Sequence, residues 1–177
     1  MDKKELRRQI RELKRAMTPE QIEQASRRLG ELFLDTPQYK NAKTIYGYLP
    51  YNQEVRTVPM LEQALKDGKK VAVPKVYGDD MKFIYMDDLS QVELGYANIP
   101  EPIADGPVAE DETALVLMPG MAFTKNGDRM GYGGGFYDKF LAKEPNHPTV
   151  ALCYSFQMVE SLPTAEYDIP VDCVLWA

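Results

Sequence analysis

The segment RMGYGGGFYD, at residues 129–138, has the residue types of a phosphate-binding turn. Glycines let the backbone approach a phosphate closely and adopt positive φ angles. A helix that starts directly after such a turn adds free N–H groups and a partial positive charge. Arg129 offers a forked donor for phosphate oxygens, and Asp138 is a carboxylate that can hold Mg²⁺ on them. The segment therefore predicts a phosphate site.

The glycine spacing alone leaves a second interpretation open. It is not a P-loop, because no Lys-Ser or Lys-Thr pair follows the glycines, and it is tighter than the G-x-G-x-x-G of dinucleotide turns. Such a spacing is as typical of a mobile surface loop as of a phosphate site. Arg129 before the glycines and Asp138 after them favour the phosphate site.

Other candidate residues lie far from this segment in the sequence. Lys3 and Arg7 are four residues apart and share a helix face, which either reaches a phosphate or is a solvated basic face. Glu54 follows the first expected strand and either holds a polar substrate group or is an exposed carboxylate. Asp168 and Asp172 are each either a second metal ligand or a turn or cap residue.

Several kinds of catalytic site are excluded by what the chain lacks. His147 is the one histidine, and we expect it to be a solvated loop residue without a nucleophile beside it. Cys153 and Cys173 lie in apolar runs, so we expect reduced, buried thiols and no zinc site. Phosphoryl transfer needs mainly positioning and charge stabilisation, which glycine, arginine, lysine and a metal-binding carboxylate can supply.

The elements that must position these residues follow an α/β pattern. Leu6, Ile10, Leu13 and Met17 form one apolar stripe on a first helix, and Thr18 begins a second helix with a capping box. Helices are also expected at 58–66 and 135–143, with a loop at 87–112. Strands are expected at 44–49, at 71–73 with its end at Pro74, at 81–86 near an edge, at 114–118 in the sheet centre, and at 150–154 and 171–176. This alternation predicts one α/β domain over residues 1–177 with a largely parallel sheet.

Charge and composition narrow the class of partner. Residues 1–16 carry a net charge of +4, which leaves −10 on the rest of a chain whose total is −6. An acidic body argues against a broad nucleic-acid surface. No stretch is apolar enough for a membrane helix and the N-terminus has no signal-peptide core, so we expect a cytoplasmic protein. We expect small-molecule partners, no membrane or nucleic acid, and a monomer or weak homodimer.

Several separated motifs together resemble the 5-formyltetrahydrofolate cyclo-ligase family, also called methenyltetrahydrofolate synthetase. The motifs are KKELR at 3–7, MPGMAF at 118–123, RMGYGGGFYD at 129–138 and YDIPVD at 167–172, with Glu54 where the family has a substrate-binding glutamate. They follow the family's order over almost the whole chain.

The resemblance implies a three-layer α/β/α fold of the NagB-RpiA-CoA-transferase-like architecture. It also implies ATP-dependent cyclisation of 5-formyltetrahydrofolate to 5,10-methenyltetrahydrofolate, with Mg²⁺. Arg129 and Lys3 would be catalytic, and Asp138 and Asp168 would bind the metal. The residues that would hold ATP are Lys3, Lys4, Arg7, Arg129, Met130, Gly131, Tyr132, Gly133, Gly134, Gly135, Phe136 and Tyr137. Those that would contact the folate are Leu49, Glu54, Tyr132, Gly133, Gly134, Gly135 and Phe136.

Two positions depart from the family pattern. Phe136 stands where tyrosine is usual, and Gly134 replaces a larger residue. An aromatic slot for the pterin would draw on Tyr46, Tyr48, Tyr51, Tyr132, Phe136 and Tyr137, about half of which we expect to be core or rim residues instead. The alternatives are a non-catalytic nucleotide- or folate-binding protein, a sugar-phosphate isomerase or acyltransferase-like enzyme, and a nucleic-acid adaptor acting through residues 1–16.

Overall fold

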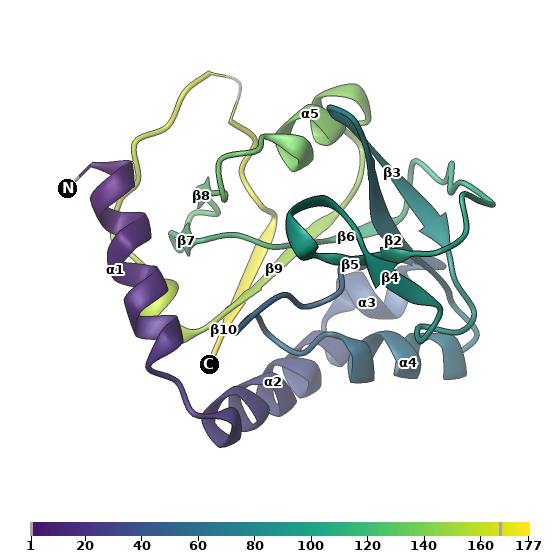
Figure 1. Cartoon of the computed structure of the whole chain (residues 1–177), viewed down its shortest axis with the longest axis horizontal. Coiled ribbons are helices and arrows are strands. Elements are labelled where there is room, and N and C mark those ends of the chain that lie inside the picture. Colours follow the sequence, from purple (N-terminus) through teal and green to yellow (C-terminus); the bar gives the residue numbers. More distant parts are fainter. Residues whose placement is uncertain (1, 167) are drawn as a thin grey trace.

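Six strands form the central sheet in the order β10-β9-β6-β1-β2-β3 (Figure 1). The computed structural model of the chain describes residues 2–166 and 168–177. The strands are β1 (Thr44–Tyr46), β2 (Lys70–Tyr77), β3 (Asp80–Tyr85), β6 (Leu115–Met118), β9 (Thr149–Cys153) and β10 (Cys173–Trp176). Neighbours are parallel except for β2 and β3, which form an antiparallel hairpin. Every residue of β6 is buried, which confirms the central strand expected from its uniformly apolar run.

Helices cover both faces of the sheet. On one face lie α2 (Pro19–Leu34), α3 (Pro37–Asn41) and α4 (Val58–Lys66), and on the other lies α5 (Phe136–Lys143). Successive strand residues point to opposite faces, so Ile45 packs in the core with Leu29 and Leu61. Tyr46 packs in the other core with Phe140. These two cores make the three-layer α/β/α fold that the resemblance implies.

Helix α1 (Lys3–Arg15) lies outside these layers, beside the loops that follow β6 (Figure 1). Its Ile10 packs against Met121 and Met130 in a separate small core. The expected apolar stripe is therefore wrong at Leu13, because this residue is 48% exposed whereas Lys14 is buried. The buried face is rotated because α1 packs against loops rather than against the sheet.

Local signals set several boundaries as expected. Thr18 caps α2 with a complete capping box, and α4 spans the predicted residues. The prediction that the second strand stops at Pro74 is wrong, since β2 continues to Tyr77. At Pro74 only β3 pairs with β2, because β1 reaches no further than Ala72 in its register. A proline is tolerated there since its missing N–H faces no partner strand.

The connections contain short elements that periodicity did not predict. The expected loop at 87–112 holds a hairpin of β4 (Val92–Leu94) and β5 (Pro100–Pro102), with the 3₁₀ turn η1 (Tyr96–Asn98) at its tip. A second ribbon, β7 (Ala122–Phe123) and β8 (Arg129–Met130), follows β6, and the turn η2 (Ser155–Gln157) follows β9. Strands of two or three residues are too short to show a period. Over the described residues, no helix has the length and apolar character to cross a bilayer.

Candidate active site

The glycine-rich segment lies at the carboxyl end of β6, as predicted. After the β7–β8 ribbon, residues 131–135 form a loop, called here the glycine loop, that leads into α5. Gly133 has φ 110° and Gly135 has φ 72°, values that favour glycine. Gly135 is the N-cap of α5 and supplies no side-chain hydrogen bond. The N-terminal N–H groups of α5 therefore face the loop with a partial positive charge.

Arg129 carries the main positive charge at this loop. Its side chain is 6% exposed, its Nη1 donates to the Pro119 carbonyl at 2.8 Å, and its Nη2 lies 3.4 Å from an oxygen of Asp138. Its Nε and the hydroxyl of Tyr137 are buried without a hydrogen-bond partner among the described residues. The guanidinium carbon lies 5.9 Å from the Tyr137 ring centre. Because unpaired buried polar atoms are costly, this pair of groups fits an anionic ligand.

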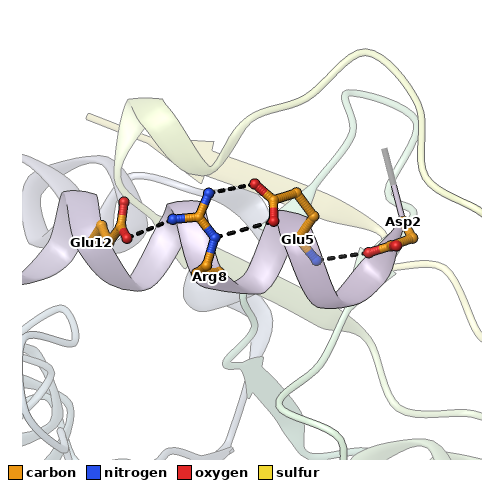
Figure 2. Close-up of polar contacts among 4 residues, drawn as sticks. All are labelled: Asp2, Glu5, Arg8 and Glu12. Carbon is orange, nitrogen blue, oxygen red and sulfur yellow. Dashed lines mark hydrogen bonds and ion pairs between the residues drawn. The ribbon is translucent and has the colours of Figure 1, made fainter.

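Arg7 is a cation of α1 that contacts the backbone of the glycine loop. Its Nε donates to the Gly131 carbonyl at 3.2 Å, although the two residues are 124 positions apart. Figure 2 shows a different arrangement for Arg8, which bonds to Glu5 and Glu12 while Asp2 caps the helix. These acids neutralise Arg8 and leave the charge of Arg7 directed to the loop.

The two lysines predicted for ATP lie in the first turn of α1. Lys3 and Lys4 are exposed, on the helix that brings Arg7 to the glycine loop. Their roles stay predictions, as does the catalytic role of Lys3.

Glu54 joins the same site from the loop after β1. Its Oε1 accepts the Tyr51 backbone N–H at 2.8 Å, and its Oε2 accepts the Tyr132 hydroxyl at 3.0 Å. Lys14 of α1 in turn donates to the Tyr132 hydroxyl at 3.1 Å. The structure thus brings the predicted Glu54 and Tyr132 together. It adds Lys14, which sequence reasoning missed because a helical lysine between other cations looks solvated.

Burial sets the electrostatics of this group. It raises the pKa of Glu54 above its ordinary value, and the charge of Lys14 is the largest influence that opposes the rise. Burial lowers the pKa of Lys14, while Glu54 acts to raise it. Burial and the charge of Glu54 raise the pKa of the Tyr132 hydroxyl well above its ordinary value. The hydroxyl therefore stays protonated and donates to the carboxylate.

The candidate aromatic residues divide between core and site. Tyr46 is 1% exposed, stacks on Phe83 at 4.5 Å, and belongs to the core. Tyr48 is buried beside Leu49 in the other core, and Glu54 acts with burial to raise the Tyr48 pKa. Tyr132 is 44% exposed at the glycine loop.

Phe136 links the glycine loop to the β4–β5 hairpin. Its ring makes an edge contact with Tyr96 at the hairpin tip, with centroids 5.3 Å apart. Gly134 lies close to the Phe136 ring, since a Cβ added at Gly134 would approach it to 3.1 Å. A larger residue at 134 would therefore require the Phe136 ring to shift by a few tenths of an ångström.

The predicted metal carboxylates occupy different settings. Asp138 faces Arg129 at the glycine loop, whereas Asp168 accepts the Ala165 backbone N–H at 2.7 Å. Asp172 accepts the Thr149 N–H at 2.9 Å and joins β9 to the start of β10. No cluster of three or more metal-ligating side chains occurs in the described part of the chain. Tyr167, which begins the predicted C-terminal motif, lies outside the described residues.

The prediction of a solvated His147 is wrong. Its side chain is 5% exposed, Nδ1 donates to the Ala114 carbonyl at 2.7 Å, and Nε2 lies 2.9 Å from Glu144 Oε1. The ring also packs 5.2 Å from Phe140. His147 therefore fixes the end of α5 against the start of β6, a role that a loop position in the sequence does not reveal.

Gln157 supports the turn that carries the site. It is 2% exposed, and its amide donates to the carbonyls of Gly120 and Met121 at 2.9 and 3.2 Å. We expect Gln157→Ala to lower the free energy of unfolding in urea by about 1–3 kcal/mol, because buried acceptors lose their donor. Gln24→Ala on the exposed face of α2 is the control and should change it by less than about 0.5 kcal/mol. Equal effects would contradict a supporting role.

Three cavities in the described part of the chain contain neither the glycine loop nor Glu54, although Phe136 lines one of them. One of about 700 Å³ lies between β2, β3 and the β4–β5 hairpin, and its lining includes Leu65, Ile84 and Ile103. It contains none of the glycine loop, Glu54 or α1. Open volume alone does not identify a site, so the convergent charges at the carboxyl edge of the sheet are the stronger indication.

Fold and site together define an α/β protein with a glycine-rich loop, bordered by Arg129, at the carboxyl edge of a largely parallel sheet. The family model described as the 5-formyltetrahydrofolate cyclo-ligase family matches residues 1–177. The 5-formyltetrahydrofolate cyclo-ligase of Escherichia coli K12 is 30% identical over 173 residues, covering 94% of this chain and 95% of its own. The Mus musculus enzyme of that name is 28% identical over 189 residues, covering 98% and 93%.

A solved structure of an enzyme named for this activity also resembles this chain. The NMR structure of Aquifex aeolicus 5,10-methenyltetrahydrofolate synthetase superposes with a TM-score of 0.85 at 30% identity, covering 99% of this chain and 90% of its own. The chain belongs to the 5-formyltetrahydrofolate cyclo-ligase family.

Proposed function

We propose that this protein is an ATP-dependent ligase that cyclises 5-formyltetrahydrofolate to 5,10-methenyltetrahydrofolate and releases ADP and phosphate. The observation that carries the proposal is the convergence at the glycine loop. Arg129 has a buried Nε without a partner among the described residues, Arg7 reaches the loop from α1, and Glu54, in the loop after β1, accepts the Tyr132 hydroxyl. Family membership supports the same activity.

The chemistry requires activation of a poor electrophile. A formamide carbon is weakly electrophilic, so we propose that the formyl oxygen attacks the γ-phosphorus and ADP leaves. N10 then attacks the activated carbon and loses its proton, and phosphate leaves with the former formyl oxygen. Holding the two reacting atoms in line can supply about 7–11 kcal/mol of the barrier reduction.

The chain's cations are suited to the charge that develops on the transferring group. In the proposal Arg129 contacts the phosphoryl oxygens through Nε, since its Nη1 is engaged by Pro119. Arg7 and Lys3 hold the remaining phosphates from α1, with the glycine-loop N–H groups and the N-terminus of α5. Lys4 adds charge at the same end of the helix.

Mg²⁺ fits this site through Asp138. Magnesium in nucleotide sites is commonly held by one or two carboxylates and the phosphates themselves, so a larger acidic cluster is not required. Asp138 is one-third exposed and lies in the first turn of α5, facing the glycine loop. When bound, Mg²⁺ neutralises phosphate charge. Asp168 is a weaker candidate, because it already accepts a backbone N–H within its own turn.

Glu54 is proposed to bind the pterin of the folate. A carboxylate matches the adjacent N–H donors on the aminopyrimidinone edge of a pterin. Tyr132 of the loop is hydrogen-bonded to Glu54, and Phe136 at the start of α5 contacts Tyr96, so both rings are proposed to supply aromatic surface. Leu49 is proposed to line the buried end of this slot.

The oxygen path tests the proposed reaction. With ¹⁸O in the formyl group, we expect the label in the released phosphate, with one ADP formed for each methenyl product. Label retained in the folate would contradict phosphorylation of the formyl oxygen. Calorimetric binding of ATP and 5-formyltetrahydrofolate without any product would instead support the alternative, a non-catalytic binding protein.

Gly133→Ala tests the role of the glycine loop. A Cβ at φ 110° has open space around it but strains the backbone by about 1–3 kcal/mol. We expect a rise of about tenfold in the KM for ATP, because part of that strain is relieved by moving the loop away from its binding conformation. Gly78→Ala in the β2–β3 turn, also at positive φ, is the matched control. A KM for ATP that changes equally in both variants would argue against phosphate binding by this loop.

We also propose a cytoplasmic protein that is a monomer or weak homodimer. The support is that Cys153 and Cys173 are free thiols, as in a reducing compartment. Light scattering after size-exclusion chromatography tests the oligomeric state, and a tight dimer at low concentration would contradict it.

A further inference from the structure

A chain of hydrogen bonds connects three segments that are far apart in the sequence. Lys14 Nζ lies 3.1 Å from Tyr132 Oη, which lies 3.0 Å from Glu54 Oε2. Lys14 is 7% exposed, an unusual position for a lysine near the end of a short amphipathic helix. Burying an ammonium group costs free energy unless it is paired, so its placement calls for an explanation.

When Lys14 is charged, the two hydrogen bonds can have only one donor-to-acceptor direction. An ammonium group only donates, so Tyr132 accepts from Lys14 and must use its own proton to bond Glu54. Glu54 then receives the hydroxyl as an ionised carboxylate. Lys14 and Glu54 thus stabilise each other's charge through one hydroxyl, in a place where burial acts against both charges.

We propose that Lys14 is a positioning residue for folate binding, which holds Tyr132 of the glycine loop against Glu54 and keeps Glu54 ionised. The inference rests on the proposed function, because the ionised Glu54 is the group assigned to the pterin. It adds a residue that none of the predicted site motifs includes. It also gives Tyr132 a second task, since its hydroxyl fixes the loop to α1.

Other charged groups near the Lys14–Tyr132–Glu54 hydrogen bonds do not take the place of Lys14 in stabilising the Glu54 charge. The titratable and charged groups that interact electrostatically with Lys14, Tyr132 or Glu54 are Arg11 of the same helix and, from other elements, Tyr48, Arg56, Arg129, Tyr137, Cys153 and Tyr154. Of the cations, Arg56 is exposed and donates to the Asn52 carbonyl, and Arg129 is engaged by Pro119 and Asp138. Arg11 is exposed and acts on Lys14 rather than on Glu54.

The test is the pH dependence of 5-formyltetrahydrofolate binding, measured by calorimetry on the full chain without ATP. Affinity falls at acid pH as Glu54 is protonated, and the midpoint reports the Glu54 pKa. Lys14→Met removes the favourable charge, so we expect the midpoint to rise by about one pH unit. Lys14→Arg, which keeps the charge, should leave the midpoint close to the wild-type value. Arg15→Met removes one charge from the exposed side of α1 and should leave the midpoint unchanged.

A double-mutant cycle separates this effect from a general loss of structure. Glu54→Gln cannot ionise, so its affinity should show no acid midpoint, and adding Lys14→Met should not introduce one. Tyr132→Phe removes the hydroxyl that links Lys14 to Glu54 and keeps both charges, so it should also raise the midpoint. This variant tests the inference even if Lys14→Met does not fold. Midpoints in Lys14→Met and Tyr132→Phe that match Arg15→Met would overturn the inference.

The assay also separates this inference from the proposed function. Wild-type protein that binds the folate with the expected midpoint shifts, but forms no product with ATP, would refute the ligase and leave the role of Lys14 intact. Wild-type protein with full activity and no shift in Lys14→Met would refute only the role of Lys14. Absence of folate binding by the wild type would refute both.

Discussion

Replacement of Arg129 by alanine is expected to lower kcat by about 10²- to 10³-fold, the range seen when one preorganised donor to developing charge is removed. The reason is geometric. Arg129 is 6% exposed, is fixed by Pro119 and Asp138, and its buried Nε has no hydrogen-bond partner among the described residues. A fixed donor stabilises charge without reorganising during the reaction. Steady-state kinetics with saturating ATP and folate measure the effect.

Two controls distinguish this role from a structural one. Arg129→Lys keeps a positive charge but loses the forked donor, so we expect it to recover only part of kcat. Arg28→Ala removes an exposed arginine of α2 and should leave kcat within about twofold, since surface pairs contribute little. Thermal unfolding of all three variants reports any loss of fold. Full kcat in a folded Arg129→Ala protein would contradict the assigned role.

Glu54→Gln is expected to lower kcat/KM for 5-formyltetrahydrofolate by about 10- to 100-fold, as when a hydrogen bond to a charged group is lost. The amide keeps the shape and can still accept the Tyr51 N–H, but it lacks the charge that holds the pterin edge. The KM for ATP should stay unchanged, because the proposal assigns Glu54 to the folate and not to ATP. Initial rates at varied folate and fixed ATP measure kcat/KM for 5-formyltetrahydrofolate.

The matched control is Glu31→Gln, which removes an exposed carboxylate of α2. It should leave both KM values unchanged. A Glu54→Gln enzyme that loses affinity for ATP as much as for folate would show that Glu54 supports the whole site rather than the pterin. An unchanged kcat/KM for folate would rule out the carboxylate as its anchor.

Much of the scaffold could be predicted because its signals are local. The capping box at Thr18, the bounds of α4 and the apolar run of β6 each depend on a few neighbouring residues. The path of β2 past Pro74 could not, since it depends on where β1 stops pairing. The hairpins of two- and three-residue strands are set by long-range pairing rather than by a period.

The candidate site also contains residues with local sequence signals and residues without them. Glycines and Arg129 could be recognised by type and spacing, and the resemblance placed Glu54 near them. Lys14 could not be found, because its burial follows from the way α1 lies against the glycine loop, 118 residues further along. His147 also depends on tertiary contacts, with Ala114 and Glu144. Residues whose role arises from packing between distant segments leave no local signal.

The most direct measurement is the ultraviolet absorbance of methenyltetrahydrofolate in a mixture of purified protein, ATP, Mg²⁺ and 5-formyltetrahydrofolate. We expect this band to grow with time at a rate proportional to protein concentration, and to be absent without ATP. No band in the presence of all components, with binding of ATP and folate demonstrated separately, would contradict the ligase activity.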